Sequence, residues 1–123
     1  MAELRTQNSV LTMFELSETI GRLTVNFHAR LIGRDWDIAV CGGSLRHIGA
    51  VALASPNTLC SVMCLPGHRE GEIAQHLASA LANHANTTVC VVCGIHLDDI
   101  SPEEILSVNS IAEKFISEFV ARI

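Results

Sequence analysis

Apolar and polar residues alternate in short runs along the first two-thirds of the chain. Between residues 23 and 31, Leu23, Val25 and Phe27 alternate with polar side chains, which is the two-residue period of a strand with one buried face. Similar runs, bounded by turn residues, predict five further strands: residues 11–18, 36–41, 50–54, 59–65 and 88–95. Gly21 lies between the first two runs, and this spacing indicates a hairpin.

The apolar spacing changes to three and four between residues 69 and 85, which predicts an amphipathic helix there. Alanine, the residue with the highest helix propensity, is frequent in this stretch. The residues that follow this spacing are Ile73, Leu77, Ala80, Leu81 and His84.

The last helix has the clearest start in the sequence. Ser101 and Glu104 have the spacing of a capping box, and Pro102 occupies the first helical position. Its apolar stripe is expected to contain Ile105, Val108, Ala112, Phe115 and Phe119. Because the strands are joined by short links, we expect a single α+β domain over residues 1–123, with a mainly antiparallel sheet of about six strands and two helices.

The composition suggests that a second copy covers part of the surface. Residues of the AVILMFWYC set make up 49% of the chain, and charged residues only 17%, against about 25% in typical soluble domains. A domain of 123 residues has few charges with which to cover itself, so we expect a homodimer.

Charge and cysteine content exclude several classes of protein. The net charge is −5 and the eight Lys and Arg residues form no basic stripe, so we expect no nucleic-acid partner. Polar residues interrupt every long uncharged stretch, and the first residues lack the apolar core of a signal peptide, so neither a membrane span nor secretion is expected. Five cysteines without a scaffold spacing favour a reduced, cytoplasmic protein with thiols in the core.

Unusual residues gather in three loops at strand ends, around residues 42–49, 66–70 and 94–98. The pair Gly42-Gly43 fits either a backbone nest for an anion or a plain turn. Residues 66–70 precede the first helix, so its free amides, with Arg69 and His68, would suit a phosphate. Alternatively, Glu70 and Glu72 themselves occupy the positive end of that helix.

One histidine lies in each loop: His47, His68 and His96. Three imidazoles hold zinc only if they converge, and hydrogen-bonded structural histidines are more common, so we assign no metal ligand. His96 and Asp98 have the spacing of an orienting pair. Because no nucleophile stands beside a base in the sequence, these residues indicate binding more than turnover.

The three loops together resemble the LpdD-like prenylated-flavin chaperone family. The matching segments are Gly42-Gly43 with Arg46-His47-Ile48-Gly49-Ala50-Val51-Ala52-Leu53-Ala54, then Leu65-Pro66-Gly67-His68-Arg69-Glu70, and Gly94-Ile95-His96-Leu97-Asp98-Asp99-Ile100-Ser101-Pro102-Glu103-Glu104-Ile105. They follow one another in order from Gly42 to the last helix, whereas the first forty residues fit only in their strand pattern.

The resemblance implies a homodimer similar in fold to proteasome-assembly chaperones. It implies an accessory protein, not a catalyst, that binds reduced prenylated FMN and delivers it to a UbiD-type aromatic acid decarboxylase. The cofactor-binding residues expected from the loops and the resemblance are Gly42, Gly43, His47, Gly49, Gly67, His68, Arg69, Glu70, His96 and Asp98. Two other functions stay open: a small metal- or histidine-dependent hydrolase or lyase, and a ligand-free assembly chaperone.

Overall fold

A computed structural model describes residues 12–123 of the chain. The elements are β1 (Met13–Ile20), β2 (Leu23–Ile32), β3 (Asp35–Gly43), β4 (Ala50–Ala54), β5 (Ser61–Cys64), α1 (Gly71–Ala85), β6 (Val89–His96) and α2 (Pro102–Arg122). These bounds confirm the predicted strands and helices to within two residues at most ends. The predicted start of the first strand, at Leu11, and the polar start of the chain lie outside the described residues.

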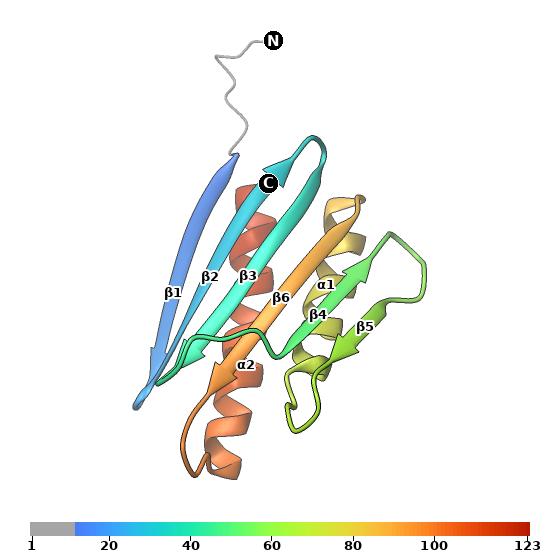
Figure 1. The fold of residues 1–123 in the computed structure, drawn as a ribbon. Helices are drawn as coiled ribbons and strands as arrows, with labels where there is room; N and C mark the ends of the chain where they lie inside the picture. The colour runs from blue at the N-terminus through green and yellow to red at the C-terminus, as the bar shows by residue number, and fades with distance from the viewer. Residues whose placement is uncertain (1–11) are drawn as a thin grey trace.

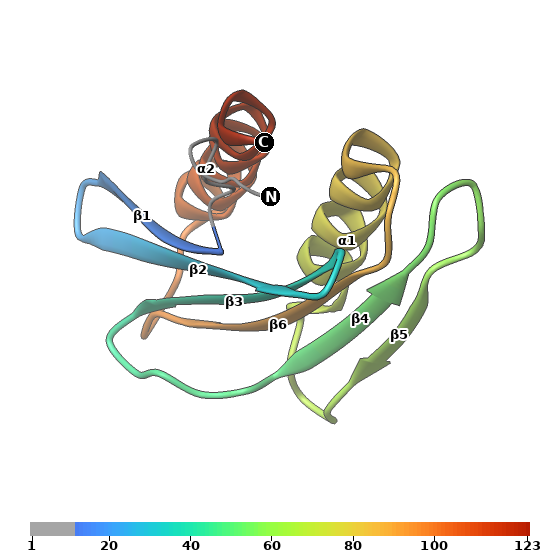
Figure 2. The same ribbon diagram turned by 90° about the horizontal axis from the view of Figure 1, so that it is seen from above.

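The strands form one sheet in the order β1-β2-β3-β6-β4-β5 (Figure 1). Only β3 and β6 run parallel, and the other neighbours are antiparallel, which confirms the expected α+β fold. Both helices cover the same face of the sheet (Figure 2). None of the helices within residues 12–123 is long and apolar enough to cross a membrane.

The insertion of β6 between β3 and β4 decides the path of the chain. Residues 44–49, here termed the crossing segment, must pass over β6 to reach β4, and they do so on the face away from the helices (Figures 1 and 2). The strand β6 is therefore central, as its apolar sequence predicts.

The helix α1 begins at Gly71, two residues later than predicted. Arg69 and Glu70 therefore precede the helix. Its buried residues are Ala74, Leu77, Ala78, Leu81 and Ala82. His84 lies on α1 as predicted, and its side chain is exposed. Small alanine side chains face the sheet here, so the buried stripe is rotated away from His84.

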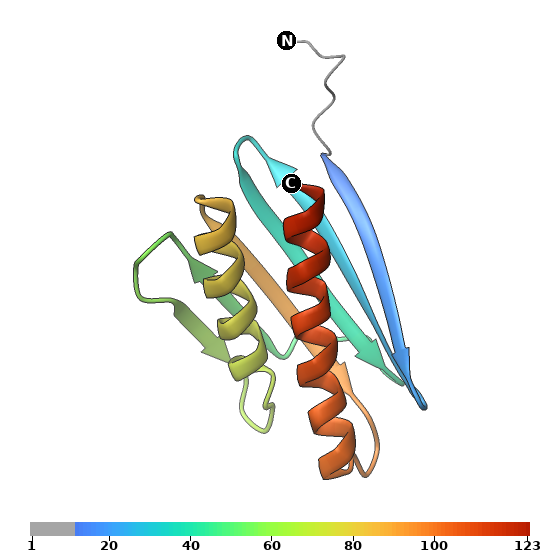
Figure 3. The ribbon, with the colours of Figure 1, turned by 180° about the vertical axis from the view of Figure 1, so that it is seen from behind.

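The capping box of α2 is present as predicted. The Glu104 backbone N–H donates to Ser101 Oγ over 3.1 Å, and the Ser101 backbone N–H donates to Glu104 Oε1 over 3.0 Å. Val108 is buried, but Ile105 is 42% exposed, which corrects its assignment to the apolar stripe. In Figure 3 the first turns of α2 extend past the end of β6, and Ile105 belongs to this part of the helix.

All the aromatic residues of the chain meet in one cluster. The ring of Phe119 on α2 lies 5.1 Å from that of Trp36 on β3 and 5.7 Å from that of Phe14 on β1. The ring of Phe27 on β2 lies 4.7 Å from that of Phe115. The second half of α2 is thus held against the β1–β3 half of the sheet by aromatic contacts.

We predict that Phe119→Ala lowers the free energy of unfolding by about 3–5 kcal/mol, because it leaves a cavity in the aromatic cluster. Urea unfolding followed by circular dichroism measures the change. The neighbouring Val120, which is 39% exposed, provides the control, and Val120→Ala should cost less than about 1 kcal/mol. Equal losses for the two variants would contradict the cluster's role.

Candidate functional site

A pocket of about 990 Å³ lies where the end of β6 meets the first turns of both helices. The turn before α1 contributes Gly67, His68, Arg69 and Glu70, and the crossing segment contributes His47. This volume is at the upper end of the range of about 300–1,000 Å³ that is usual for small-molecule sites. The three loops singled out in the sequence therefore do meet at one place.

Gly43 and Gly94 lack side chains, and this allows the crossing segment to lie directly against β6. A Cβ atom on Gly94 would lie 1.7 Å from the carbonyl oxygen of His47, and one on Gly43 would lie 1.8 Å from that of His96. Gly43 also has a φ of +82°, which disfavours other residues. A side chain at either position would displace the backbone that carries a histidine of the pocket.

Packing within the protein explains why glycine occupies three of the predicted cofactor-binding positions. The space beside Gly42 is filled by β2, and the space beside Gly43 by the His96 carbonyl. A Cβ atom on Gly49 would lie 2.5 Å from Oε2 of Glu70. None of these three is among the residues that line the pocket, so their contact with a cofactor stays a prediction.

Glu70 connects the elements around the pocket. Its side chain is only 9% exposed, and its Oε2 lies 2.6 Å from Nε2 of His47. The backbone N–H of Ile95 donates to Oε2 over 3.3 Å, and that of Arg69 donates to Oε1 over 3.0 Å. One carboxylate therefore joins the crossing segment, β6 and the start of α1.

Burial opposes ionisation of the Glu70 carboxyl, yet its pKa is held below the ordinary value. Hydrogen bonds from the backbone N–H of Glu70 itself, from His47, and from the backbone of Ile95 and Arg69 favour the charged form and outweigh the burial. The Glu70 side chain makes no cap bond to the first turn of α1. The first-turn amides of α1 are therefore not capped by this carboxylate.

The three histidines predicted from the loops converge. The ring of His47 lies 5.1 Å from that of His68 and 6.3 Å from that of His96, measured between centroids. Nε2 of His96 lies 3.0 Å from Oδ1 of Asp98, which is the predicted orienting pair. Asp98 itself is not among the lining residues and is mostly exposed.

Comparison with known proteins gives a family. Residues 19–123 match the family described as the prenylated flavin chaperone LpdD-like domain. The chain belongs to this family. No curated protein matches it by sequence.

A chain in the crystal structure of a chaperone complex for yeast 20S proteasome assembly shares the fold of this LpdD-like protein. The TM-score is 0.63 at 15% sequence identity, over 91% of this chain and 98% of that chain. At this identity the likeness concerns the fold alone, and it confirms the architecture expected from the resemblance.

An apolar wall in the LpdD-like pocket escaped the sequence analysis. Its residues are Ile73, Ile95, Leu97, Ile100, Ile105 and Val108. The sequence signal that could have revealed this wall is the apolar residues at the start of α2, such as Ile105.

Cys64 also lines the pocket and is exposed. Its predicted place in the core is therefore wrong, because every residue of the edge strand β5 is exposed.

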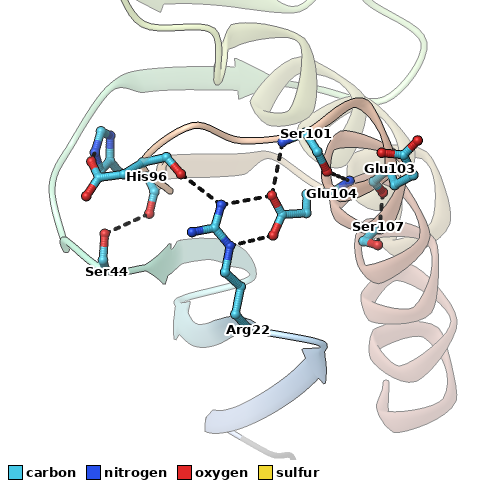
Figure 4. A network of polar contacts seen from close by, with 8 residues as sticks. Arg22, Ser44, His96, Ser101, Glu103, Glu104 and Ser107 are labelled. Atoms are coloured by element: carbon cyan, nitrogen blue, oxygen red, sulfur yellow. Dashed lines mark hydrogen bonds and ion pairs between the residues drawn. The ribbon is translucent and has the colours of Figure 1, made fainter.

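Arg22 fixes the loop that follows β6 (Figure 4). Its Nε donates to Glu104 Oε2 over 2.6 Å, and its Nη2 donates to the carbonyl oxygen of Asp98 over 2.8 Å. The Ser44 backbone N–H donates to the His96 carbonyl over 2.9 Å. The hairpin between β1 and β2 thereby holds the start of α2, one wall of the pocket.

The hydrogen bond from Arg22 lowers the pKa of Glu104 from the ordinary 4.5 to about 2, with help from the Ser101 backbone N–H. A lowered pKa stabilises the fold above the unfolded-state value, and this contribution is lost as the pH falls toward 2. We predict that Arg22→Gln makes the loss of stability between pH 4.5 and pH 2 shallower than in the wild type.

Urea midpoints measured across this pH range test the prediction. Arg34→Gln removes the same charge from the exposed turn between β2 and β3 and should keep the wild-type pH dependence. Parallel pH profiles for the wild type and Arg22→Gln would show that the Arg22–Glu104 pair does not hold the loop in solution.

Proposed function

We propose that this LpdD-like protein binds reduced prenylated FMN in the pocket and delivers it to a UbiD-type aromatic acid decarboxylase. The family supports a prenylated-flavin chaperone. The observation that carries the proposal is the pairing of a polar end with an apolar wall in one pocket of about 990 Å³. A prenylated flavin nucleotide has the same two parts, a phosphate and an apolar ring system.

The polar end suits the phosphate group. Among the described lining residues, Arg69 is the only arginine or lysine, and it directly precedes Glu70 at the start of α1. Gly71 and Glu72 of the first turn also line the pocket, so uncapped amides and a guanidinium lie together. The carboxylate of Glu70 makes no cap bond to the first-turn amides, because its partners are His47 and the backbone N–H groups of Ile95 and Arg69.

The apolar wall suits the prenyl-modified rings. Ile95 and Leu97 come from the end of β6, while Ile105 and Val108 come from α2. The exposed Ile105 would lose contact with water when an apolar ligand binds, which favours binding. His96 and the remaining polar groups would meet the flavin edge.

The way the polar groups are used supports an accessory role, with catalysis left to the client enzyme. Glu70 and His47 are bonded to each other and to the backbone, so they hold elements together. We place this role in the cytoplasm, because all five cysteines are free thiols and a reducing compartment keeps them so.

We predict that anaerobic titration with reduced prenylated FMN gives a dissociation constant below tens of micromolar. Arg69→Ala should weaken binding about tenfold or more, because a charge-assisted hydrogen bond contributes about 1.5–3 kcal/mol. Arg34→Ala removes an exposed arginine from a distant turn and should leave the affinity unchanged. The loaded protein, mixed with an apo-decarboxylase, should then restore decarboxylation.

No binding at tens of micromolar would rule out the flavin. Equal affinity in the wild type and Arg69→Ala would remove Arg69 from phosphate binding. Binding without transfer to any apo-decarboxylase would leave a flavin-binding protein and refute the carrier role.

We further propose that the protein is a homodimer through the uncovered face of the sheet. Eight of the sixteen exposed large hydrophobic residues in the described chain fall between residues 45 and 65. On β4 and β5 of this face, Val51, Leu53 and Met63 are 36%, 51% and 73% exposed. The β2 part of the same face carries polar residues such as Asn26, so the apolar part is a distinct patch. A second copy presents the same patch, which makes it a suitable partner.

We predict a dimer in analytical ultracentrifugation of the wild type. Leu53→Glu should shift it toward the monomer, because a charge would be buried in the apolar patch. Asn26→Glu places the same charge on the polar part of the face and should leave the dimer intact. A wild type that sediments as a monomer at tens of micromolar would refute the dimer.

A further inference from the structure

We propose that His47, His68 and Glu70 form a binding site for a divalent transition-metal ion. Each residue offers one ligand atom, and these three atoms all lie within 4.8 Å of one another. They come from two segments far apart in the sequence, the crossing segment and the turn before α1, so the fold assembles the cluster. The proposal is independent of the flavin.

The donor set has the chemistry of a known class of metal sites. Two imidazoles with one carboxylate bind zinc in sites that keep a position open, and they also bind Fe²⁺. Imidazole nitrogens favour such ions over Mg²⁺ and Ca²⁺, which take oxygen ligands. All three side chains line the pocket, and His68 is 35% exposed, so an ion has a path from solvent.

The contacts of His47 call for a cation. Its Nδ1 lies 3.2 Å from the carbonyl oxygen of Leu45, and its Nε2 lies 2.6 Å from Oε2 of Glu70. Both neighbours are acceptors, whereas a neutral imidazole has only one N–H. Either tautomer therefore directs a nitrogen lone pair at an oxygen, and a cation bound beside the two side chains would relieve this repulsion.

The position of Leu45 favours the metal ion. A metal-bound histidine usually donates its other ring N–H to a carbonyl or carboxylate, which fixes the ring and directs the free nitrogen at the metal. The Leu45 carbonyl occupies that place for His47. His68 supplies a further ring nitrogen, with Nδ1 3.6 Å from Oε1 of Glu70.

Calorimetric titration of the full chain with zinc chloride, after chelator treatment and without flavin, tests the site. We expect about one zinc ion per chain. His68→Ala should weaken binding at least tenfold, a loss in keeping with the effect of disturbing a metal site. Glu70→Gln keeps the shape of the side chain and should weaken binding in the same way.

Two control variants make the result specific. His76 also contacts a glutamate, Glu113, but lies on the exposed side of α1, so His76→Ala should bind zinc like the wild type. Cys64 lines the pocket and its thiol is a potential zinc ligand, so Cys64→Ser should also keep the affinity. With Co²⁺ as a spectroscopic probe, d–d bands without thiolate charge transfer should appear.

Three results would overturn the proposal: no zinc uptake by the wild type, equal uptake by His68→Ala, or loss of uptake in Cys64→Ser. The first would mean that the cluster is held by hydrogen bonds alone. Because flavin is absent from this titration, its failure leaves the flavin proposal standing, and zinc uptake without flavin binding would do the reverse.

Discussion

The structure around the pocket depends on one buried carboxylate. Glu70 is buried in the turn before α1. Removing its charge from water is costly unless its oxygens accept hydrogen bonds from the protein. His47 and the backbone N–H of Ile95 both form hydrogen bonds with Oε2 of Glu70. The crossing segment and the end of β6 must therefore both lie close to the turn before α1. That approach leaves no room for side chains at Gly49 and Gly94. The positions of the histidines follow from this single requirement.

Local features of the fold were accessible to sequence reasoning because each depends on neighbouring residues. The alternation in β2 and the capping box at Ser101 are of this kind, and both were predicted. The convergence of His47 with His68 was not, because it depends on β6 lying between β3 and β4. No local pattern encodes that order. Ile105 shows the same limit, since its helical spacing is correct but its side chain is 42% exposed.

The distribution of aromatic residues determines which contacts the pocket can make with a ligand. Phe27, Trp36 and Phe119, with the two other rings, are used in the core, and none of them lines the pocket. A flavin bound there would be held by Arg69, aliphatic side chains, imidazoles and backbone amides, without stacking on a phenyl or indole ring. The extra attraction between stacked aromatic rings is therefore not available in this pocket. Its absence agrees with the proposed carrier role, in which the client must bind the flavin more tightly.

The helix α2 is held firmly at one end and lightly at the other, and this gradient bears on release. Its second half contributes Phe115 and Phe119 to the aromatic cluster, whereas its first turn is attached to the sheet through Arg22, whose side chain is 52% exposed. Exposed ion pairs contribute little to stability, and regions with few buried contacts open at low cost. The pocket wall at Ile105 belongs to the lightly held end. Opening there would expose a bound ligand, as the proposed delivery to a decarboxylase requires, while the aromatic core stays intact.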